Sequence, residues 1–328
     1  MAQHLAKECQ KPLPETHCLS VFKPMKHNSL LLSGLLPLFL LPSAHLPTVP
    51  PGSILINEIL SNPNPDGVDF IELYNYCDTT IDLRTLAIAS VNANGVSGKP
   101  RKITEQAIFI RPKEYKVLTI NLYILQQQYP NSAYETFVET PTLPNFNSKT
   151  GGVVLYSDDI VIDSLFYTPQ RQSPFVAESK GFSLERQYLA IPTNAQGNFH
   201  SAASVIGGAT PGYKNSQSPS TAEQHGFSLT SRTFSPDNDG FEDELEITYA
   251  LPQSGFMAKI DIYNANGYLV KKLCRNQSLA TQGRIGWNGL SDANQRPPLG
   301  LYVAVIEIYH PTGTTKIYRL SFVLAARL

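Results

Sequence analysis

The segment that most constrains the fold of this chain runs from Ile54 to Asn75 and reads ILINEILSNPNPDGVDFIELYN. Its two apolar-rich runs flank a loop, Ser61 to Gly67, made of residues that break strands and favour turns. The segment therefore predicts two paired strands joined by a loop.

Alternation within these runs predicts which side chains share a face of the sheet. One face of the first run would carry Ile54, Ile56, Glu58 and Leu60. The second run would place Ile71 and Leu73 opposite Phe70, Glu72 and Tyr74. Both strands are then apolar on two sides, as expected inside a β-sandwich.

Composition supports an all-β fold. Aromatic residues make up 10% of the 328 residues, and 25 prolines and 21 glycines punctuate the chain. Aromatic residues favour strands, whereas Pro and Gly favour turns.

The length suits about two domains. The charge is balanced, with 26 basic and 27 acidic residues, which argues against nucleic-acid binding and against a polybasic membrane contact.

The N-terminus has the layout of a secretory signal peptide. Lys23 and Lys26 precede an apolar run from Leu30 to Leu41, and the small residues Pro42-Ser43-Ala44 follow it. The run is shorter than the about 20 apolar residues of a membrane span. We predict an N-terminal extension and signal peptide over residues 1–44, with Met25 as an alternative start, and no transmembrane span after cleavage.

Two strand-rich regions are predicted after the signal. A Pro-rich lead-in over 45–52 precedes a first β-sandwich over 53–216, in which Asn121 to Tyr129 is the single helix candidate. The polar stretch 217–225 reads as a linker. A second β-sandwich is predicted over 226–328.

The second region alternates more cleanly than the first. Apolar residues at 245, 247, 249 and 251 face one way and polar residues at 244, 246 and 248 the other, which is typical of an antiparallel sheet with one solvated face. Asn264-Ala265-Asn266-Gly267 predicts a hairpin because Asn and Gly tolerate positive φ. Trp287 is predicted to fill the core.

Several motifs of the first region occur in a characteristic order. Asn57-Glu58-Ile59-Leu60 and Asp69 to Asn75 open it, and Gly181 to Arg186 and Gly208 to Asn215 close it. These motifs resemble the bacterial lamin-tail domain, an immunoglobulin-like β-sandwich. Thr80 to Leu86 departs from the family pattern, with Arg-Thr-Leu where Ser-Gly-Trp is commoner. The resemblance implies an immunoglobulin-like interaction module over 53–216.

The second region has its own ordered motifs. They are Phe234 to Asp243, Trp287-Asn288-Gly289, Asp292 to Gln295 and Gly300-Leu301-Tyr302. Together they resemble the immunoglobulin-like module of flagellar hook-capping type, which ends many Bacteroidetes surface proteins, including gliding-motility and type IX secretion substrates. The resemblance implies a spacer or sorting domain and a secreted or outer-surface location.

Cysteine usage predicts neither a disulfide framework nor a zinc site. Cleavage would leave Cys77 and Cys274, one in each predicted domain, and neither has the Cys-x-x-Cys or Cys-His spacing of a zinc ligand. We expect both to be buried as small hydrophobic residues.

Two acidic groups are candidates for calcium, which prefers oxygen ligands. The first is the loop around Gly240 with Asp237, Asn238, Asp239, Glu242 and Asp243. It lacks the 12-residue EF-hand pattern, and the alternative is a turn capped by Asp and Asn side chains. The second comprises Glu58, Asp66, Asp69 and Glu72. A hydrogen-bonded corner of Asn and Glu with solvated loop acids is the alternative there.

Catalytic patterns are scarce. Glu58 and Glu72 would suit glycosidic hydrolysis only if one were buried enough to stay protonated. His45, His200, His225 and His310 lack a metal-pair spacing, and Gly181 to Glu185 falls short of Gly-x-Ser-x-Gly. Glu185 and Arg186 are expected to form a structural ion pair or backbone hydrogen bonds.

The sequence therefore predicts a non-enzymatic secreted or cell-surface binding or structural protein. No cofactor is expected apart from calcium, and the partner would be a protein or a glycan at the cell surface. The alternatives are a secreted hydrolase, either a nuclease or a glycosidase, and a calcium-stabilised adhesin.

Overall fold

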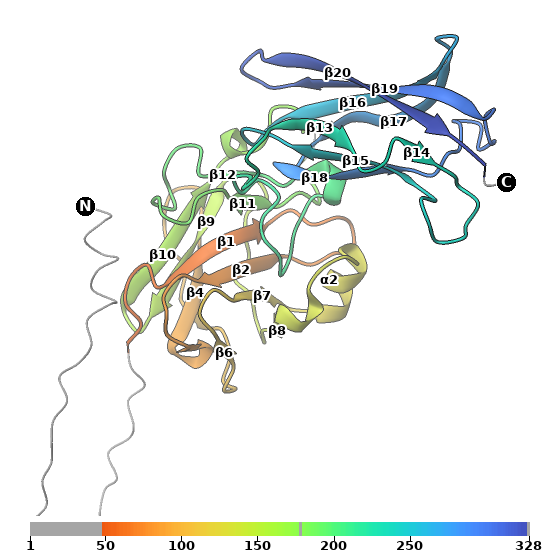
Figure 1. Ribbon diagram of the computed structural model, residues 1–328. Coiled ribbons are helices and arrows are strands. Elements are labelled where there is room, and N and C mark those ends of the chain that lie inside the picture. The colour runs from red at the N-terminus through yellow and green to blue at the C-terminus, as the bar shows by residue number, and fades with distance from the viewer. Residues whose placement is uncertain (1–47, 177–178, 327–328) are drawn as a thin grey trace, which may run out of the picture.

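A computed structural model describes residues 48–176 and 179–326, so the predicted extension and signal peptide lie outside the described residues. The fold is all-β, as predicted, and the strands form five sheets. They fall into an N-terminal half and a C-terminal half, which lie end to end in Figure 1. In the described ranges no helix has the length and hydropathy needed to cross a membrane.

The N-terminal half contains two main sheets and one small ladder. The six-stranded sheet has the order β12 (Phe199–Ser201), β11 (Leu184–Arg186), β1 (Ile54–Leu60), β2 (Phe70–Asn75), β7 (Tyr115–Thr119), β8 (Phe137–Glu139). The four-stranded sheet has the order β10 (Ile160–Tyr167), β9 (Gly151–Ser157), β4 (Leu86–Val91), β5 (Arg101–Lys102). The ladder pairs β3 (Ile81–Asp82) with β6 (Phe109–Ile110).

The helical elements are short. The predicted helix is confirmed as α2 (Leu122–Gln128), with the Asn121 side chain accepting a hydrogen bond from the Ile124 N–H as its N-cap. The single 3-10 turns are η1 (Leu83–Thr85), η2 (Tyr134–Thr136), η3 (Pro169–Arg171) and η4 (Ser204–Ile206).

The central strands β1 and β2 of the six-stranded sheet are buried on both faces. Their inner face packs against the four-stranded sheet around residues such as Ile56, Ile71 and Leu155. Part of the outer face is covered by α2, whose Leu125 packs with Leu60, Phe70 and Val117. Because neither face of these two strands meets water, any acidic residue on them must find hydrogen-bond donors within the protein.

A β-bulge at Asn57 decides where Glu58 lies. The pairing of β1 with β2 shifts between Ile56 and Glu58, so Ile56 pairs with Leu73 but Glu58 pairs with Glu72. Ile54 and Ile56 face the inner core, whereas Leu60 belongs to the outer cluster. Glu58 and Leu60 therefore share the outer face, as predicted, but Ile54 and Ile56 lie on the inner face, because the extra residue at the bulge reverses the alternation.

The C-terminal half contains two further sheets. One has the order β13 (Gly226–Leu229), β15 (Leu245–Ala250), β18 (Gln282–Trp287). The other has the order β14 (Thr233–Phe234), β20 (Thr315–Leu324), β19 (Gly300–Tyr309), β16 (Met257–Asn264), β17 (Leu269–Ser278). Side chains of both sheets form one core, and Trp287 is confirmed as a core residue with 1% of its surface exposed.

The hairpins expected from local turn signals are present. β16 and β17 meet at Asn264 to Tyr268, with Gly267 at φ 79°, and β9 and β10 meet at Asp158 and Asp159. β19 and β20 pair along their whole length around Pro311 to Gly313. Cys77 and Cys274 are both free and buried, as predicted.

The two halves are joined by direct hydrogen bonds. The Ser204 N–H donates to the Ser278 hydroxyl and the Ser278 N–H donates to the Ser204 hydroxyl, each over 2.7 Å. The Thr281 N–H donates to the Ser216 carbonyl over 2.9 Å. Gln217, the first residue of the predicted linker, is 1% exposed at this junction. The predicted domain boundaries stay a prediction.

Candidate functional site: a buried row of glutamates and an open basic groove

Three glutamates form a row across the outer face of the six-stranded sheet. Glu58 on β1 is the direct cross-strand partner of Glu185 on β11 and of Glu72 on β2. All three are 0% exposed. Like-charged residues directly opposite one another destabilise a sheet unless protons or donors compensate.

The donors come mainly from the segment after η4, residues 208–217, which we call the closing segment. The Glu58 carboxylate accepts hydrogen bonds from the Ser183 hydroxyl at 2.5 Å and from the Thr210 N–H at 3.0 Å. Glu185 accepts from the Ser216 hydroxyl at 2.8 Å and from the Gln217 N–H at 2.9 Å.

Glu72 is held from both sides. The Asn57 side-chain amide donates to its Oε1 over 2.6 Å, and the Gly212 N–H donates to its Oε2 over 2.6 Å. Asn57 also donates to the Asn215 Oδ1 over 2.8 Å, and the Asn215 amide donates to the Asn57 and Arg186 carbonyls. The expected hydrogen-bonded corner of Asn and Glu is thus present.

Burial shifts the acidity of the whole row. It raises the pKa of Glu58 to about 8, with a further rise from Glu185, against the opposing effect of the Ser183 and Thr210 hydrogen bonds. Burial, then the neighbouring Glu58, raises the pKa of Glu72 well above its usual value. Burial also raises the pKa of Glu185.

A carboxyl that stays protonated at neutral pH meets the electrostatic condition for a general acid. It must also come within hydrogen-bond reach of a substrate. The described oxygens of the row instead contact donors of the chain itself, and their residues have no exposed surface. In this conformation the arrangement fastens the closing segment to the sheet.

Arg186 and Asp163 fasten the two sheets next to this row. The fully buried Arg186 guanidinium donates to the Asp163 carboxylate on β10 over 3.0 Å and to the Ile56 carbonyl over 2.9 Å. The Ile56 N–H donates to the same carboxylate over 2.8 Å. Arg186 and Asp163 thus form hydrogen bonds with the backbone of β1 next to its bulge. The expected structural role of Arg186 is confirmed, with Asp163 as its ion-pair partner.

Glu58, Asp66, Asp69 and Glu72 do not converge on one cation site, contrary to the calcium hypothesis. Asp66 is exposed in the turn with φ 62°, whereas the two glutamates are sealed beneath the closing segment. Among the described residues, the acidic side chains that lie close enough together to hold one ion are instead those of Asp237, Asp239 and Asp243. Glu58 and Glu72 thus lie in the buried row, whereas Asp66 is exposed and Asp69 is partly exposed in the loop.

The three acidic residues that do lie close together belong to the predicted acidic loop around Gly240. Carboxylate oxygens of Asp237, Asp239 and Asp243 lie within 4.8 Å of one another. The same groups cap the turn, since Asp243 accepts from the N–H groups of Asn238 and Gly240. Asn238 and Glu242 supply the left-handed backbone, at φ 63° and 52°. Calcium binding here stays a prediction.

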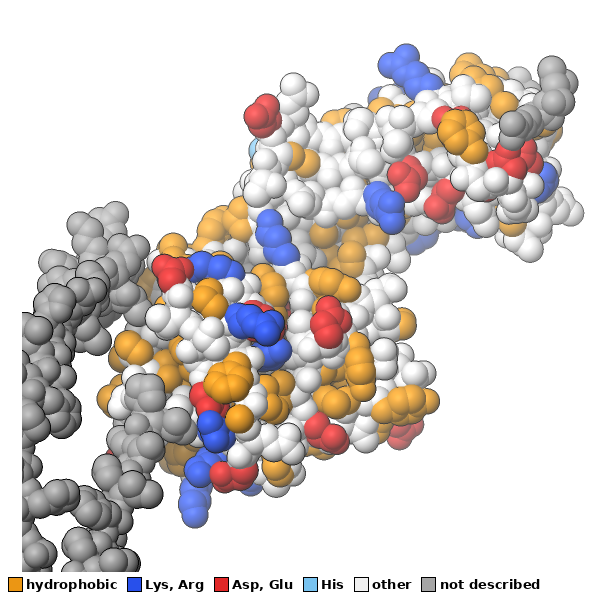
Figure 2. Space-filling view, turned by 60° about the horizontal axis from the view of Figure 1, so that its bottom comes forward, with side chains coloured by type: hydrophobic (Ala, Val, Ile, Leu, Met, Phe, Trp, Pro, Cys, Tyr) orange, Lys and Arg blue, Asp and Glu red, His pale blue; other side chains and the backbone are white. Residues whose placement is uncertain are grey.

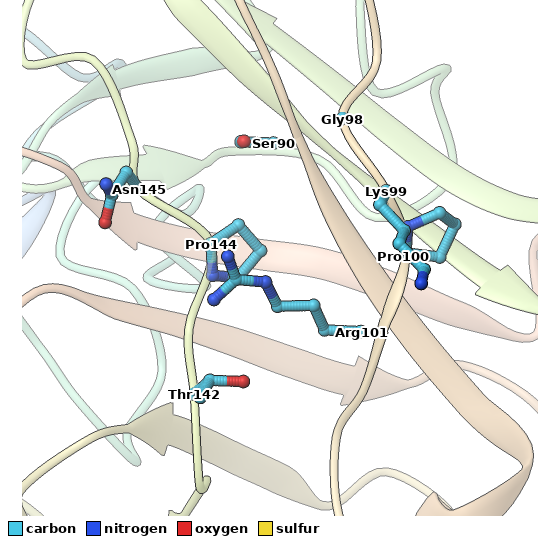
Figure 3. Close-up of a pocket in the computed structure, with 8 residues that line it drawn as sticks. All are labelled: Ser90, Gly98, Lys99, Pro100, Arg101, Thr142, Pro144 and Asn145. Atoms are coloured by element: carbon cyan, nitrogen blue, oxygen red, sulfur yellow. The ribbon is translucent and has the colours of Figure 1, made fainter.

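An open groove lies in the N-terminal half, between residues 98–101 and residues 142–145. Its volume is about 730 Å³, and its lining consists of Ser90, Gly98, Lys99, Pro100, Arg101, Thr142, Pro144 and Asn145. Figure 3 shows Arg101 extending from one wall toward Pro144 and Thr142 on the other. Its Nη1 donates to the Leu143 carbonyl over 3.1 Å.

Sequence reasoning found part of the glutamate row and missed the groove. Glu58, Glu72 and Glu185 each stand within an apolar run, and that pattern was the available signal for buried acidic residues. The closing motif, Gly208 to Asn215, contains several of their hydrogen-bond donors. The groove has no such signal, because it depends on the approach of two extended segments about forty positions apart; the Arg101–Leu143 contact spans 42.

Comparisons with known proteins add little to this picture. No protein-family model matches the chain, and no curated protein matches its sequence. Solved structures with partial similarity include dimeric latent PorU from Porphyromonas gingivalis, with 8% identity and a TM-score of 0.26 over 79% of this chain and 18% of that one.

Two further structures are similar at the same level. PorZ, described as an essential surface component of the type-IX secretion system of Porphyromonas gingivalis, has 14% identity and a TM-score of 0.26 over 81% of this chain and 30% of PorZ. A tetra-tandem repeat of a large adhesion protein has 8% identity and a TM-score of 0.21 over 83% and 48%. This chain spans less than half of each, and these superpositions are too loose to carry an argument about function.

Proposed function

We propose that this chain is a non-enzymatic, secreted or cell-surface protein that binds or supports other molecules at that surface. The observation that supports this most is the use of Glu58, Glu72 and Glu185: their carboxyl groups hold the closing segment instead of facing a cleft. The groove then provides a surface for contact with a partner.

The extracellular location is supported by the signal-peptide pattern of residues 1–44 and by the motifs of the C-terminal half. In the proposal the N-terminal half is the interaction module, and the C-terminal half is a spacer or sorting domain of the type IX secretion kind. Surface charge is compatible with such a role, since basic and acidic side chains are interspersed on the face shown in Figure 2.

Fractionation combined with activity screening tests the proposal. We expect the processed chain outside the cytoplasm, and no hydrolysis of polysaccharide or nucleic-acid substrates by the purified protein. Glu58→Gln provides the matched variant, because it keeps the shape of the side chain and removes its titration. Hydrolysis by the wild type that is lost in a folded Glu58→Gln variant would establish the hydrolase alternative instead.

The calcium-stabilised alternative is distinguished by thermal unfolding. A ligand that binds only the folded state raises the melting temperature. An increase on addition of Ca²⁺ that disappears in Asp237→Asn/Asp239→Asn would support it, since Asn keeps the turn-capping oxygen and removes the charge. An unchanged melting temperature with chelator and with Ca²⁺ would leave the loop as a capped turn.

A further inference from the structure

The groove between residues 98–101 and 142–145 carries positive charge that the protein does not neutralise. In the described part of the chain, neither Lys99 nor Arg101 forms an ion pair with an acidic side chain, whereas the adjacent Lys102 pairs with Glu105 at 3.3 Å. No acidic residue lines the groove. The groove is therefore matched in charge to an anion.

The guanidinium of Arg101 is already positioned for such a contact. One of its five N–H groups donates to the Leu143 carbonyl, which holds the side chain across the groove. A planar guanidinium binds carboxylate or sulfate oxygens through paired N–H groups, and an ammonium such as that of Lys99 adds a second charge without fixed geometry.

The rest of the lining favours a ligand rich in hydroxyl groups. Ser90, Thr142 and Asn145 offer hydroxyl and amide groups that both donate and accept hydrogen bonds. Pro100 and Pro144 supply rigid apolar surfaces on opposite walls (Figure 3). The volume of about 730 Å³ falls within the roughly 300–1,000 Å³ of small-ligand sites.

The groove is poorly suited to an added peptide strand. β5 is an edge strand of only two residues, Arg101–Lys102, and Pro100 before it has no N–H to donate to a neighbouring strand. Without consecutive donors and acceptors along this edge, recognition must rely on side chains.

We propose that this groove binds an acidic oligosaccharide, with a carboxylate or sulfate group held by Arg101, positive charge added by Lys99 on the same wall, and sugar hydroxyls held by Ser90, Thr142 and Asn145. This inference rests on the proposed binding function and names its ligand class. Because both basic side chains are exposed, added salt must weaken the contact.

Calorimetric titration of the full chain with trigalacturonate, its neutral methyl ester and triglutamate tests the inference. We expect saturable binding of trigalacturonate that weakens with salt, and much weaker binding of the other two probes. Arg101→Gln should weaken it about tenfold, as loss of one charge-assisted contact does, and Lys99→Gln/Arg101→Gln more. The matched control is Lys272→Gln/Lys316→Gln, which removes two exposed charges in the C-terminal half.

The inference is overturned if trigalacturonate fails to bind, if the methyl ester or triglutamate binds equally well, or if the control variant loses as much affinity as the groove variant. In that case Lys99 and Arg101 only protect the sheet edge. Such a failure leaves the proposed extracellular, non-enzymatic role intact, because fractionation and hydrolysis assays report on that role separately.

Discussion

At the scale of single residues, the hydroxyl of Thr210 indicates where a proton lies in the glutamate row. Its oxygen is 2.8 Å from Glu185 Oε1 and 3.2 Å from Glu58 Oε2, yet it has only one proton to donate. A protonated Glu58 resolves this conflict: its carboxyl donates to Thr210, and Thr210 donates to the Glu185 carboxylate. The pKa of about 8 for Glu58 agrees with that direction.

Glu58→Gln tests this protonation state. A carboxyl whose pKa rises on folding from 4.5 to about 8 contributes stability that is fully present below pH 4.5 and is lost as pH rises through 8. The slope is at most about 1.4 kcal/mol per pH unit for one proton. We expect the wild-type free energy of unfolding to fall between pH 5 and pH 8 more steeply than that of Glu58→Gln, measured by urea denaturation.

Comparison of the two proteins cancels titrating groups outside the row, whereas Glu72, whose pKa Glu58 raises, keeps part of its own pH dependence in the variant. A glutamine can accept from Ser183 and the Thr210 N–H and donate to the Thr210 hydroxyl, so the fold should persist. Identical pH slopes for wild type and variant would show that Glu58 is ionised in the folded protein, contrary to the proton assignment.

At the scale of elements, the closing segment acts as an irregular cover for the outer face of β11, β1 and β2. Asn215 anchors this segment through three hydrogen bonds: its side-chain amide donates to the carbonyls of Asn57 and Arg186, and its Oδ1 accepts from the Asn57 amide. It is 4% exposed. Loss of this side chain leaves buried polar groups without partners.

We therefore expect Asn215→Ala to lower the free energy of unfolding by about 3 kcal/mol, since each unsatisfied buried group costs roughly 1–3 kcal/mol. Chemical denaturation followed by circular dichroism gives the value. Asn94→Ala, in the exposed turn after β4, is the control and should change it by less than about 0.5 kcal/mol. A similarly small effect at Asn215 would mean that the cover is not fastened as described.

The elements also show what the sequence could and could not predict. Hairpins such as Asn264 to Gly267 were predictable because turn chemistry is local. The position of Glu58 was not, because the bulge at Asn57 reverses the alternation. Nor were the donors of the glutamates, since Thr210 lies 152 positions from Glu58 and Asn215 lies 158 from Asn57. Proximity of such distant segments is a property of the fold, whereas local patterns report only on neighbours.

At the scale of the whole molecule, the closing segment connects the glutamate row to the C-terminal half. The Gln217 N–H donates to Glu185, while its side chain donates to the Leu279 carbonyl over 3.2 Å and accepts from the Gly255 N–H over 3.2 Å. The two halves are therefore expected to unfold as one unit.

The single tryptophan makes this measurable. Trp287 fluorescence reports on the C-terminal core, whereas circular dichroism reports on all strands. The two thermal transitions should coincide in the wild-type chain and separate in Gln217→Ala, because the variant loses the side-chain bridge. Transitions that already differ in the wild type would show that the halves are independent.

The buried carboxyl groups of the row fasten the closing segment to the sheet. Amide hydrogen exchange at Thr210, Gly212 and Gln217 measures this fastening, because these N–H groups donate to Glu58, Glu72 and Glu185. We expect exchange as slow as that of β1 and β2, governed by global unfolding. Exchange as fast as that of an exposed loop would show that the row opens to solvent and that the closing segment is not fastened.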